Sequence, residues 1–443
     1  MLNSTALVID NTVAYASVNP TKYGRPSISF SNSPDYQGYL ERKQFYKRLN
    51  IVDNPFFVPH EGVNNGITRV GGQELLNFSS YNYLALSGDE QVSSAAKEAI
   101  ERYGTSVSAS RIVSGEIPLH RELELAIAHF IGTENCMLYV GGHATNVTTI
   151  GHLFGPKDLI LHDAFAHNSI VEGCKLSGAR RLMFQHNSPD HLEKLLRRHG
   201  DLFQRILIVI EGVYSMDGDI ADLPAFIKLK QKYNAMLMVD EAHSLGVLGA
   251  RGRGISEHFG IGPRDVDLWM GTLSKALASC GGYIAGSSEI IEFLKFTSPG
   301  FVFSVGMPPS NAAAALAALR RIEAQPERVR TLAERSTLFL QTAKAKGLNT
   351  GLSAGTAIVP VITGDSVAAV QLSAALLNTG INAKPIIYPA VENDAARVRF
   401  FIAADHSEEQ ILHAVDRIAE EWRKLAGRGP DHGKPQAVGE QTH

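Results

Sequence analysis

Short, continuous runs of apolar residues recur through the middle of the chain and predict β-strands. They span residues 136–140, 158–164, 205–212, 235–242, 267–271 and 282–286. Strands without polar alternation are typical of a sheet that is covered on both faces and is mainly parallel. Helical segments separate several runs, as at residues 188–200 and 223–233. This alternation predicts a doubly wound α/β domain, in which ligands bind beyond the carboxyl ends of the strands.

The pattern changes after about residue 305. A long helical segment at 310–347 precedes strands at 357–364, 383–389 and 397–404 and a closing helix at 407–426. This succession predicts a smaller α+β domain packed against the first. We therefore expect an N-terminal arm over residues 1–45, a large domain over 46–330, a small domain over 331–425 and a disordered tail over 426–443.

The composition is that of an ordinary globular protein, since 44% of the 443 residues are hydrophobic and the formal net charge is −3. This balance gives no reason to expect a nucleic acid partner. No apolar run approaches the roughly 18–20 residues of a membrane span, and the first residues lack the pattern of a signal peptide. The three cysteines have no metal-ligand spacing, so we expect no metal site and a reduced, cytoplasmic setting.

Polar side chains gather where the predicted strands end. Asp240 ends an apolar strand, where its carboxylate is costly to ionise unless a cation faces it. Lys275 lies among small and apolar residues, which lower the pKa of an amine and make it a nucleophile. A glycine pair at 141–142 leads into a predicted helix whose free N–H groups can hold an anion. A carboxylate, an amine and an anion site together suit pyridoxal 5′-phosphate (PLP), and the 275 − 240 = 35 residues between Asp240 and Lys275 suit adjacent strands.

Four segments resemble the α-oxoamine synthases among the fold-type I PLP enzymes. They are EGVYSMDGDIADL (211–223), VDEAHSLGVLGARGRG (239–254), GTLSKA (271–276) and GGYIAG (281–286). The resemblance runs from about residue 54 to 411 and is strongest to serine palmitoyltransferase-like members and polyketide-associated synthase modules. It implies an α/β fold with a large, mainly parallel-sheet domain and a smaller α+β C-terminal domain. It also implies a homodimer with a shared active site.

The resemblance gives a role to each matching residue around the cofactor. Lys275 is expected to form the Schiff base with PLP and to act as the acid and base at the substrate Cα. Asp240 is expected to pair with the ring nitrogen, and His243 and Ser215 to contact the phenolic oxygen. His167 is expected to stack on the ring and contact the substrate.

Further roles concern the phosphate and the substrate. The backbone amides of Gly142 and His143, with Thr272, are expected to hold the PLP phosphate, and Ser304 to reach the phosphate in the neighbouring subunit. Arg399 is expected to bind the amino acid carboxylate, and Arg397 faces the same side of its strand. Tyr81 and Asn82 are expected near the thioester entrance, where Tyr81 replaces an asparagine that many members carry. Ser110 stands where glycine-specific members carry threonine, so an alanine- or serine-sized substrate is expected to fit.

The activity implied is a decarboxylative Claisen-type condensation. A small amino acid (glycine, alanine or serine) and an acyl thioester, of CoA or an acyl carrier protein, would give an α-amino ketone, CO2 and a free thiol. One alternative is a class I or II aminotransferase, which uses a similar cofactor site. Another is a catalytically silent synthase subunit, which the presence of Lys275 and Asp240 disfavours. The amino acid, the acyl chain and the thioester carrier stay open.

Overall fold

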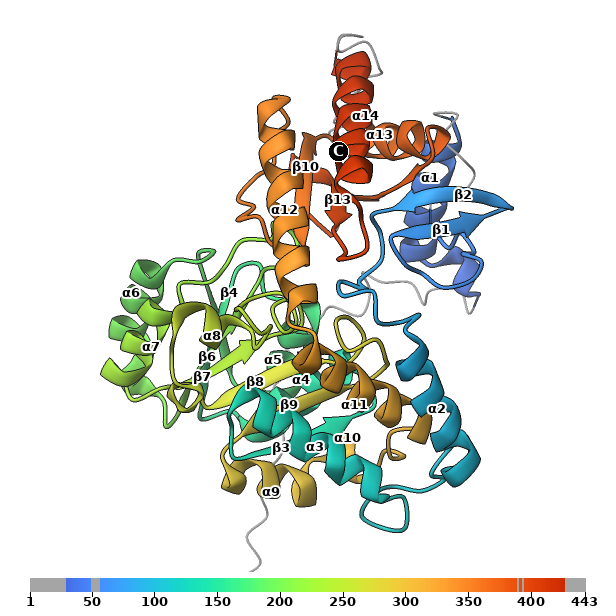
Figure 1. Cartoon of the computed structure of the whole chain (residues 1–443). Helices are drawn as coiled ribbons and strands as arrows, with labels where there is room; N and C mark the ends of the chain where they lie inside the picture. Colours follow the sequence, from blue (N-terminus) through green and yellow to red (C-terminus); the bar gives the residue numbers. More distant parts are fainter. Residues whose placement is uncertain (1–28, 49–55, 389, 393, 427–443) are drawn as a thin grey trace, which may run out of the picture. The chain divides into compact units, whose positions relative to one another are not determined.

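A computed structural model describes residues 29–48, 56–388, 390–392 and 394–426. The chain divides into two units, residues 1–54 and 55–443. The first contains the short helix η1 (Phe30–Asn32) and the helix α1 (Pro34–Arg48); both begin in the predicted arm, and α1 ends three residues beyond its expected boundary at residue 45 (Figure 1). Residues 1–28 of that arm, and the predicted tail from residue 427, lie outside the described residues.

A seven-stranded sheet forms the centre of the second unit, in the order β3-β9-β8-β7-β6-β4-β5. In chain order its strands are β3 (Asn135–Tyr139), β4 (Leu159–Asp163), β5 (Arg180–Phe184), β6 (Ile206–Glu211), β7 (Met236–Asp240), β8 (Leu268–Thr272) and β9 (Gly282–Gly286). Strand β9 is antiparallel to β3 and β8, and the other pairs are parallel. The predicted α/β fold with a mainly parallel sheet is confirmed.

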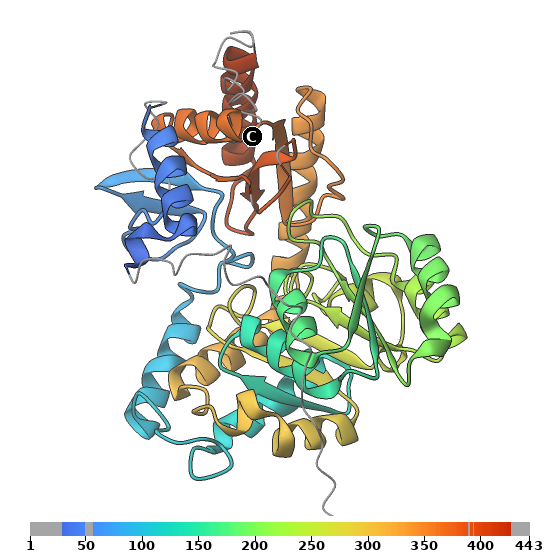
Figure 2. The ribbon, with the colours of Figure 1, turned by 180° about the vertical axis from the view of Figure 1, so that it is seen from behind.

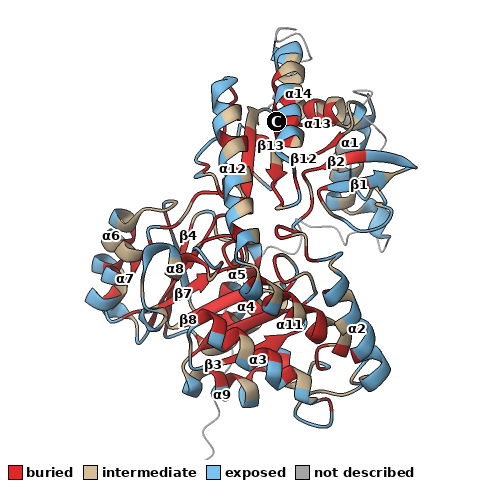
Figure 3. Cartoon of the chain, in the orientation of Figure 1, coloured by how far each residue is buried: buried red, intermediate tan, exposed pale blue. Residues whose placement is uncertain are grey.

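The sheet is buried because helices cover both faces (Figure 3). Successive residues of β6 alternate between two hydrophobic clusters, as Leu207 belongs to one and Ile208 to the other. The helices of this part of the chain are α2 (Glu90–Tyr103), α3 (Pro118–Ile131), α4 (Gly142–Leu153), α5 (Asn168–Ser177), α6 (Pro189–His199), η2 (Gly200–Leu202), α7 (Leu223–Lys232), α8 (Ile255–Phe259), η3 (Pro263–Asp265), α9 (Ser288–Thr297), α10 (Pro299–Val302) and α11 (Pro309–Ala324). None of the described helices is long and apolar enough to cross a membrane.

Two smaller sheets involve the C-terminal part of the chain (Figure 2). One is antiparallel, in the order β10 (Ile358–Gly364), β13 (Ala396–Phe401), β12 (Lys384–Ile386). The other has the order β1 (Ile67–Val70), β2 (Gln73–Asn77), β11 (Ile381–Asn382). The helices here are α12 (Glu327–Ala345), α13 (Ser366–Asn378) and α14 (Glu408–Ala426). Residues 67–77, expected to accompany the large domain, thus pair with a strand from the C-terminal part, whereas the domain division near residue 330 stays a prediction.

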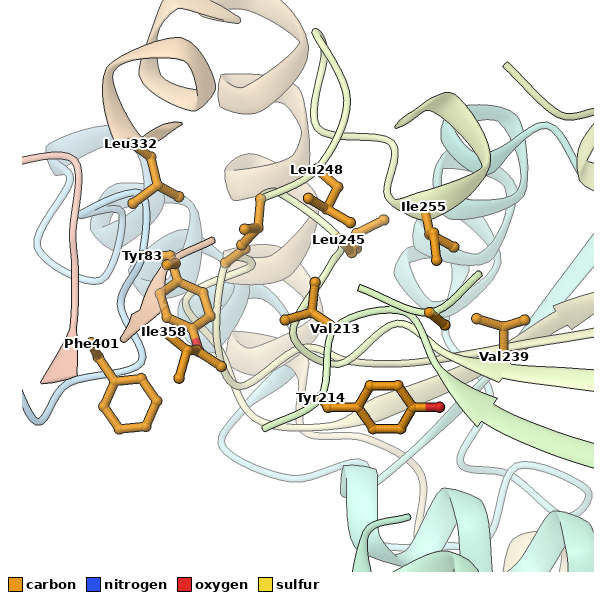
Figure 4. Close-up of a cluster of buried hydrophobic side chains, with 14 of the residues drawn as sticks. Tyr83, Val213, Tyr214, Val239, Leu245, Leu248, Ile255, Leu332, Ile358 and Phe401 are labelled. Carbon is orange, nitrogen blue, oxygen red and sulfur yellow. The ribbon is translucent and has the colours of Figure 1, made fainter. Parts of the chain in front are cut away.

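The loop after β6 is anchored in the hydrophobic core. Val213 and Tyr214 are buried in a cluster that also contains Tyr83, Ile358 and Phe401 (Figure 4). Gly218 in the same loop has a φ of +73°, and a Cβ there would lie 2.1 Å from a backbone oxygen of β10. Only glycine therefore fits this close approach. The core thus fixes the segment that carries Ser215.

Candidate active site

An open pocket of about 610 Å³ lies at the carboxyl ends of the central parallel strands. Its lining residues are Gly142, His143, Asn146, His167, Ser169, Glu211, Asp240, Ala242, His243, Met270, Thr272, Ser274 and Lys275. The predicted site residues Gly142, His143, His167, Asp240, His243, Thr272 and Lys275 are among them. The structure thus brings these predicted residues together from widely separated segments of the chain. They meet beyond the carboxyl ends of the strands, where ligands bind in doubly wound proteins.

Lys275 follows β8, and its Nζ lies 2.7 Å from Nε2 of His243, which follows the neighbouring strand β7. Burial lowers the pKa of Lys275 to about 8, although the carboxylates of Asp240 and Glu211 oppose this change. Burial and the Lys275 charge also lower the pKa of His243 well below its usual value. Lys275 is therefore an amine that is easily deprotonated, as a Schiff-base nucleophile must be.

Asp240 is a buried carboxylate at the end of β7. Its Oδ2 accepts a hydrogen bond of 2.8 Å from Nδ2 of Asn146, and its Oδ1 accepts one of 2.9 Å from the backbone of Ala242. Neutral donors hold the carboxylate in place without neutralising it. Such a buried anion at a pocket wall suits a cationic ring nitrogen.

His167 caps the N-terminus of α5, and its side chain is held in one tautomer. Asn146 Nδ2 donates to Ser169 Oγ at 2.9 Å, and the Ser169 hydroxyl lies 2.7 Å from Nδ1 of His167. The backbone N–H of Ser169 also donates to Nδ1, at 3.2 Å. Nδ1 is thus the acceptor, and the proton of the neutral ring is on Nε2. Burial lowers the pKa of His167 and so favours this neutral form, although the negative charge of Asp240 opposes the change.

The start of α4 and the end of β8 form a close contact. A Cβ on Gly142 would lie 2.9 Å from Oγ1 of Thr272, so glycine is needed for this approach. The first N–H groups of a helix have no partner within it and are available to an anion. His143 is exposed, and its ring centroid lies 6.4 Å from that of His167. The backbone of this turn, with the Thr272 hydroxyl, suits a phosphate.

Arg399 and Ser215 do not line the pocket but are joined to each other. Nη1 of Arg399 donates to the backbone oxygen of Ser215 at 2.6 Å, and its guanidinium lies 4.6 Å from the ring centroid of Phe401. Burial lowers the pKa of Arg399, whose charge in turn contributes to lowering the pKa of Lys275. Arg397, two residues earlier on β13, contacts the same loop through an ion pair of 2.8 Å with Asp217.

In the segment 81–83, Tyr81 lies near Lys275, whereas the side chain of Asn82 forms hydrogen bonds within its own loop. The Tyr81 ring centroid lies 5.7 Å from Nζ of Lys275. The Asn82 side chain instead accepts from the backbone of Leu86 and Ser87 and donates to Asn65. Both ends of the amide are therefore engaged in the loop, and the substrate contact expected for Asn82 stays a prediction.

Ser110 and Ser304 lie apart from the pocket lining. Ser110 forms an isolated β-bridge with Val305, and the Ser304 hydroxyl donates to the Val305 backbone oxygen at 3.3 Å. Ser304 and Val305 line a separate, smaller pocket. The roles expected for Ser110 and Ser304 therefore stay predictions.

Among the residues of the site that had no predicted role are Tyr83, Asn146, Ser169 and Glu211. The Tyr83 hydroxyl lies 2.7 Å from Nδ1 of His243, and Glu211 accepts the backbone N–H of His167 at 2.7 Å. Glu211 pairs with Asp240 across neighbouring strands, so its position at a strand end was a signal that could have identified it. Tyr83 is 160 residues from His243, and no local pattern connects them.

The functional groups of this pocket fit PLP. A buried amine is available for the aldehyde, a buried carboxylate for the ring nitrogen, and a helix start with a hydroxyl for the phosphate. The fold and this pocket define a PLP-dependent enzyme of fold type I. In agreement, residues 73–418 match the family described as aminotransferase class I and II.

Individual relatives narrow this class. The chain is 41% identical over 360 residues to 8-amino-7-oxononanoate synthase of Fervidobacterium nodosum, covering 81% of this chain and 91% of that protein. It is 38% identical over 371 residues to serine palmitoyltransferase of Bacteroides thetaiotaomicron, covering 84% and 93%. Serine palmitoyltransferase of Sphingomonas wittichii has a similar structure, with a TM-score of 0.85 at 30% identity over 89% of this chain and 98% of that one. The chain belongs to the α-oxoamine synthases, within the class I and II aminotransferase family.

A second solved relative supports the same family. The 8-amino-7-oxononanoate synthase of Francisella tularensis matches with a TM-score of 0.68 at 26% identity, over 80% of this chain and 99% of that one. The finer resemblance to serine palmitoyltransferase-like members stays a prediction, because the two kinds of curated relative match at similar identity.

Proposed function

We propose that this enzyme condenses a small amino acid with an acyl thioester, releasing CO2 and a thiol and forming an α-amino ketone. One observation carries the proposal: the buried amine of Lys275 and the buried carboxylate of Asp240 lie in one pocket at the ends of adjacent strands. The names of the relatives add the reaction class, since 8-amino-7-oxononanoate synthase and serine palmitoyltransferase are both α-oxoamine synthases.

Residues in and around the pocket would hold the cofactor. Lys275 would bind its aldehyde carbon, and Asp240 would keep a proton on its ring nitrogen. The neutral ring of His167 would pack against the cofactor ring, and His243 and Ser215 would contact its phenolic oxygen. The backbone of Gly142 and His143, with the Thr272 hydroxyl, would hold its phosphate. PLP, when bound, supplies an electron sink for the bond broken at the substrate Cα.

Arg399 and Lys275 act on the substrate. Arg399 binds the amino acid carboxylate and so orients the Cα–H bond toward Lys275. Once the substrate amino group had displaced Lys275 from the cofactor, the free amine of Lys275 would take the Cα proton, and the electron-rich carbon left behind would form a bond to the thioester carbonyl carbon. The C–S bond would break, and the thiolate would leave and take a proton from solvent. The amino acid carboxylate then leaves as CO2, and Lys275 returns a proton to Cα.

We further propose that the enzyme is a homodimer in which Ser304 serves the partner's site. The segments of Ser110 and Val305, joined by a β-bridge, carry the exposed side chains of Val113 and Phe303. The Phe303 side chain is 87% exposed, and Val113 and Val305 are exposed as well, so these two segments offer several apolar side chains to a partner. A cytoplasmic setting, which the free state of all three cysteines suits, stays a prediction.

The test is a product assay on the PLP-loaded enzyme with glycine, L-alanine or L-serine and a short-, medium- or long-chain acyl-CoA. We expect CO2 and free CoA thiol in equal amounts, with Lys275→Ala as the inactive control. Transfer of the amino group to a keto acid without CO2 release would instead identify an aminotransferase. The absence of both reactions, with an acyl carrier protein thioester as well, would identify a silent subunit. Ser110→Thr is expected to restrict the enzyme to glycine.

A further inference from the structure

A half-buried histidine outside the pocket, His186, lies between two carboxylates. Nδ1 of His186 lies 2.8 Å from Oδ1 of Asp163, and its Nε2 lies 3.0 Å from Oδ2 of Asp219. The ring of Phe165 stacks on it at 4.1 Å, and the edge-on ring of Tyr214 lies 4.5 Å away. His186 does not line the pocket of Lys275. Both of its ring nitrogens are engaged by these carboxylates, so we consider it as a residue that acts on the reaction through other residues.

The partners of His186 determine its protonation. A carboxylate offers no proton, so both ring nitrogens must donate, which requires the imidazolium form. Burial of the ring opposes the charge, but the hydrogen bonds to Asp163 and Asp219 prevail and raise the pKa of His186 to about 9. The Tyr214 hydroxyl also donates to Asp163, at 2.9 Å, so that carboxylate is held from two sides.

The two carboxylates belong to the two loops that carry proposed cofactor contacts. Asp163 ends β4, and its Oδ1 accepts the backbone N–H of Phe165 at 2.7 Å, two residues before His167. Asp219 closes the turn that contains Ser215, because its backbone oxygen accepts the N–H of Tyr214 at 3.0 Å. The imidazolium thus joins the His167 loop to the Ser215 loop.

We propose that His186 is a positioning residue whose cationic ring holds the loops of His167 and Ser215 in register at the cofactor pocket. The inference rests on the cofactor contacts proposed above for His167 and Ser215. A neutral or shorter side chain at position 186 leaves Asp163 and Asp219 as two buried carboxylates that repel each other. The two loops then separate, and their contacts to PLP weaken together.

The experiment compares PLP affinity and steady-state kinetics of the full-length enzyme and His186→Gln. We expect PLP to bind about tenfold to a hundredfold more weakly, and kcat at saturating PLP to fall while KM for the thioester stays within about twofold. Arg205→Gln is the matched control, since it removes a 2.6 Å ion pair to buried Asp158, just before the opposite end of β4. Unchanged PLP affinity in His186→Gln, or an equal loss in Arg205→Gln, would overturn the proposal.

A second variant keeps the test independent of the folding of His186→Gln. Loss of the His186 proton near pH 9 should weaken PLP binding in the wild-type enzyme. Asp219→Asn retains a hydrogen-bond acceptor but removes one charge facing His186, so this alkaline fall in PLP affinity should begin about one pH unit lower. An unmoved alkaline limb would contradict the proposal. The ¹⁵N spectrum of the apoprotein should show both nitrogens of His186 protonated at neutral pH, and a single protonated nitrogen would also overturn it. If the wild-type protein takes up no PLP, the proposed function fails, while the ¹⁵N spectrum still tests His186.

Discussion

Lys275 and His243 lie within 2.7 Å of each other, Nζ to Nε2, and burial lowers the pKa of both. Because the pKa of Lys275 is about 8, about a tenth of the side chain is a free amine at pH 7, far more than for an ordinary lysine. Only the free amine attacks an aldehyde. The structure therefore connects the burial of this side chain directly to the loading of the cofactor.

The rate of PLP uptake by the apoprotein should follow the deprotonation of Lys275. Below about pH 8 the rate should rise about tenfold per pH unit, and above it the rate should level off. Stopped-flow absorbance after mixing apoprotein with PLP at a series of pH values measures this profile. A midpoint above about pH 10, the value of an ordinary lysine, would show that Lys275 is not perturbed.

Replacing Lys275 with methionine should abolish activity and stabilise the apoprotein at neutral pH. The folded pKa is below the unfolded value of 10.5, so folding disfavours the charged form. This penalty is fully present below about pH 8 and disappears as the pH rises past 10.5. Urea unfolding should show a gain of up to about 3 kcal/mol at neutral pH that fades at high pH. Exposed Lys194→Met is the control, and a loss of stability in Lys275→Met would contradict the assignment.

Replacing Ser169 with alanine should release the tautomer of His167. The Ser169 hydroxyl at 2.7 Å is one of the two donors to Nδ1, so its loss weakens the preference for a proton on Nε2. We expect kcat to fall about tenfold and the ¹⁵N shifts of His167 to indicate a mixture of tautomers. Ser177→Ala, which removes a 2.7 Å hydrogen bond at the other end of the same helix, should change neither. A single unchanged tautomer in Ser169→Ala would sink this explanation.

Arg399 and Arg397 should be separable by experiment. Arg399→Lys should raise KM for the amino acid about tenfold or more, because an ammonium loses the bidentate contact to a carboxylate. Arg397→Gln should instead reduce stability by about 3 kcal/mol, because it leaves buried Asp217 without its ion-pair partner. Substrate kinetics and urea unfolding of both variants check the division. Equal KM effects would show that both arginines bind substrate.

The sequence predicted the buried strands better than the exposed or oppositely directed ones. Strand β6 is apolar throughout because both of its faces are covered. Strand β5 was not predicted, because it lies at the sheet edge and keeps Arg180, Arg181 and Met183 exposed, which breaks the apolar run. The apolar run of β9 indicated a strand, but its antiparallel direction depends on tertiary pairing that no local pattern records.

The residues of the site, like the strands, could be predicted only in part from the sequence. Lys275 and Asp240 were predictable because strand ends of one sheet meet, and the structure places them in one pocket. The Tyr83 contact to His243 was not, because it depends on how a distant loop packs. The pairing of the Asn82 amide within its own loop was likewise not indicated by the local sequence. Sequence patterns thus identified the residues on the sheet better than those on the loops around it.

The charge on His186 should make stability depend on pH in a defined window. Its folded pKa, about 9, is above the unfolded value of 6.5, so its contribution is fully present below pH 6.5 and is lost as the pH rises through about 9. The shift corresponds to up to about 3 kcal/mol. Urea unfolding of wild type and His186→Gln should therefore differ most near pH 6 and converge toward about pH 10. Taking the difference between the two proteins cancels the opposite trend of Lys275, which both retain. A difference that stays constant across this range would show that His186 is not held as a cation by Asp163 and Asp219.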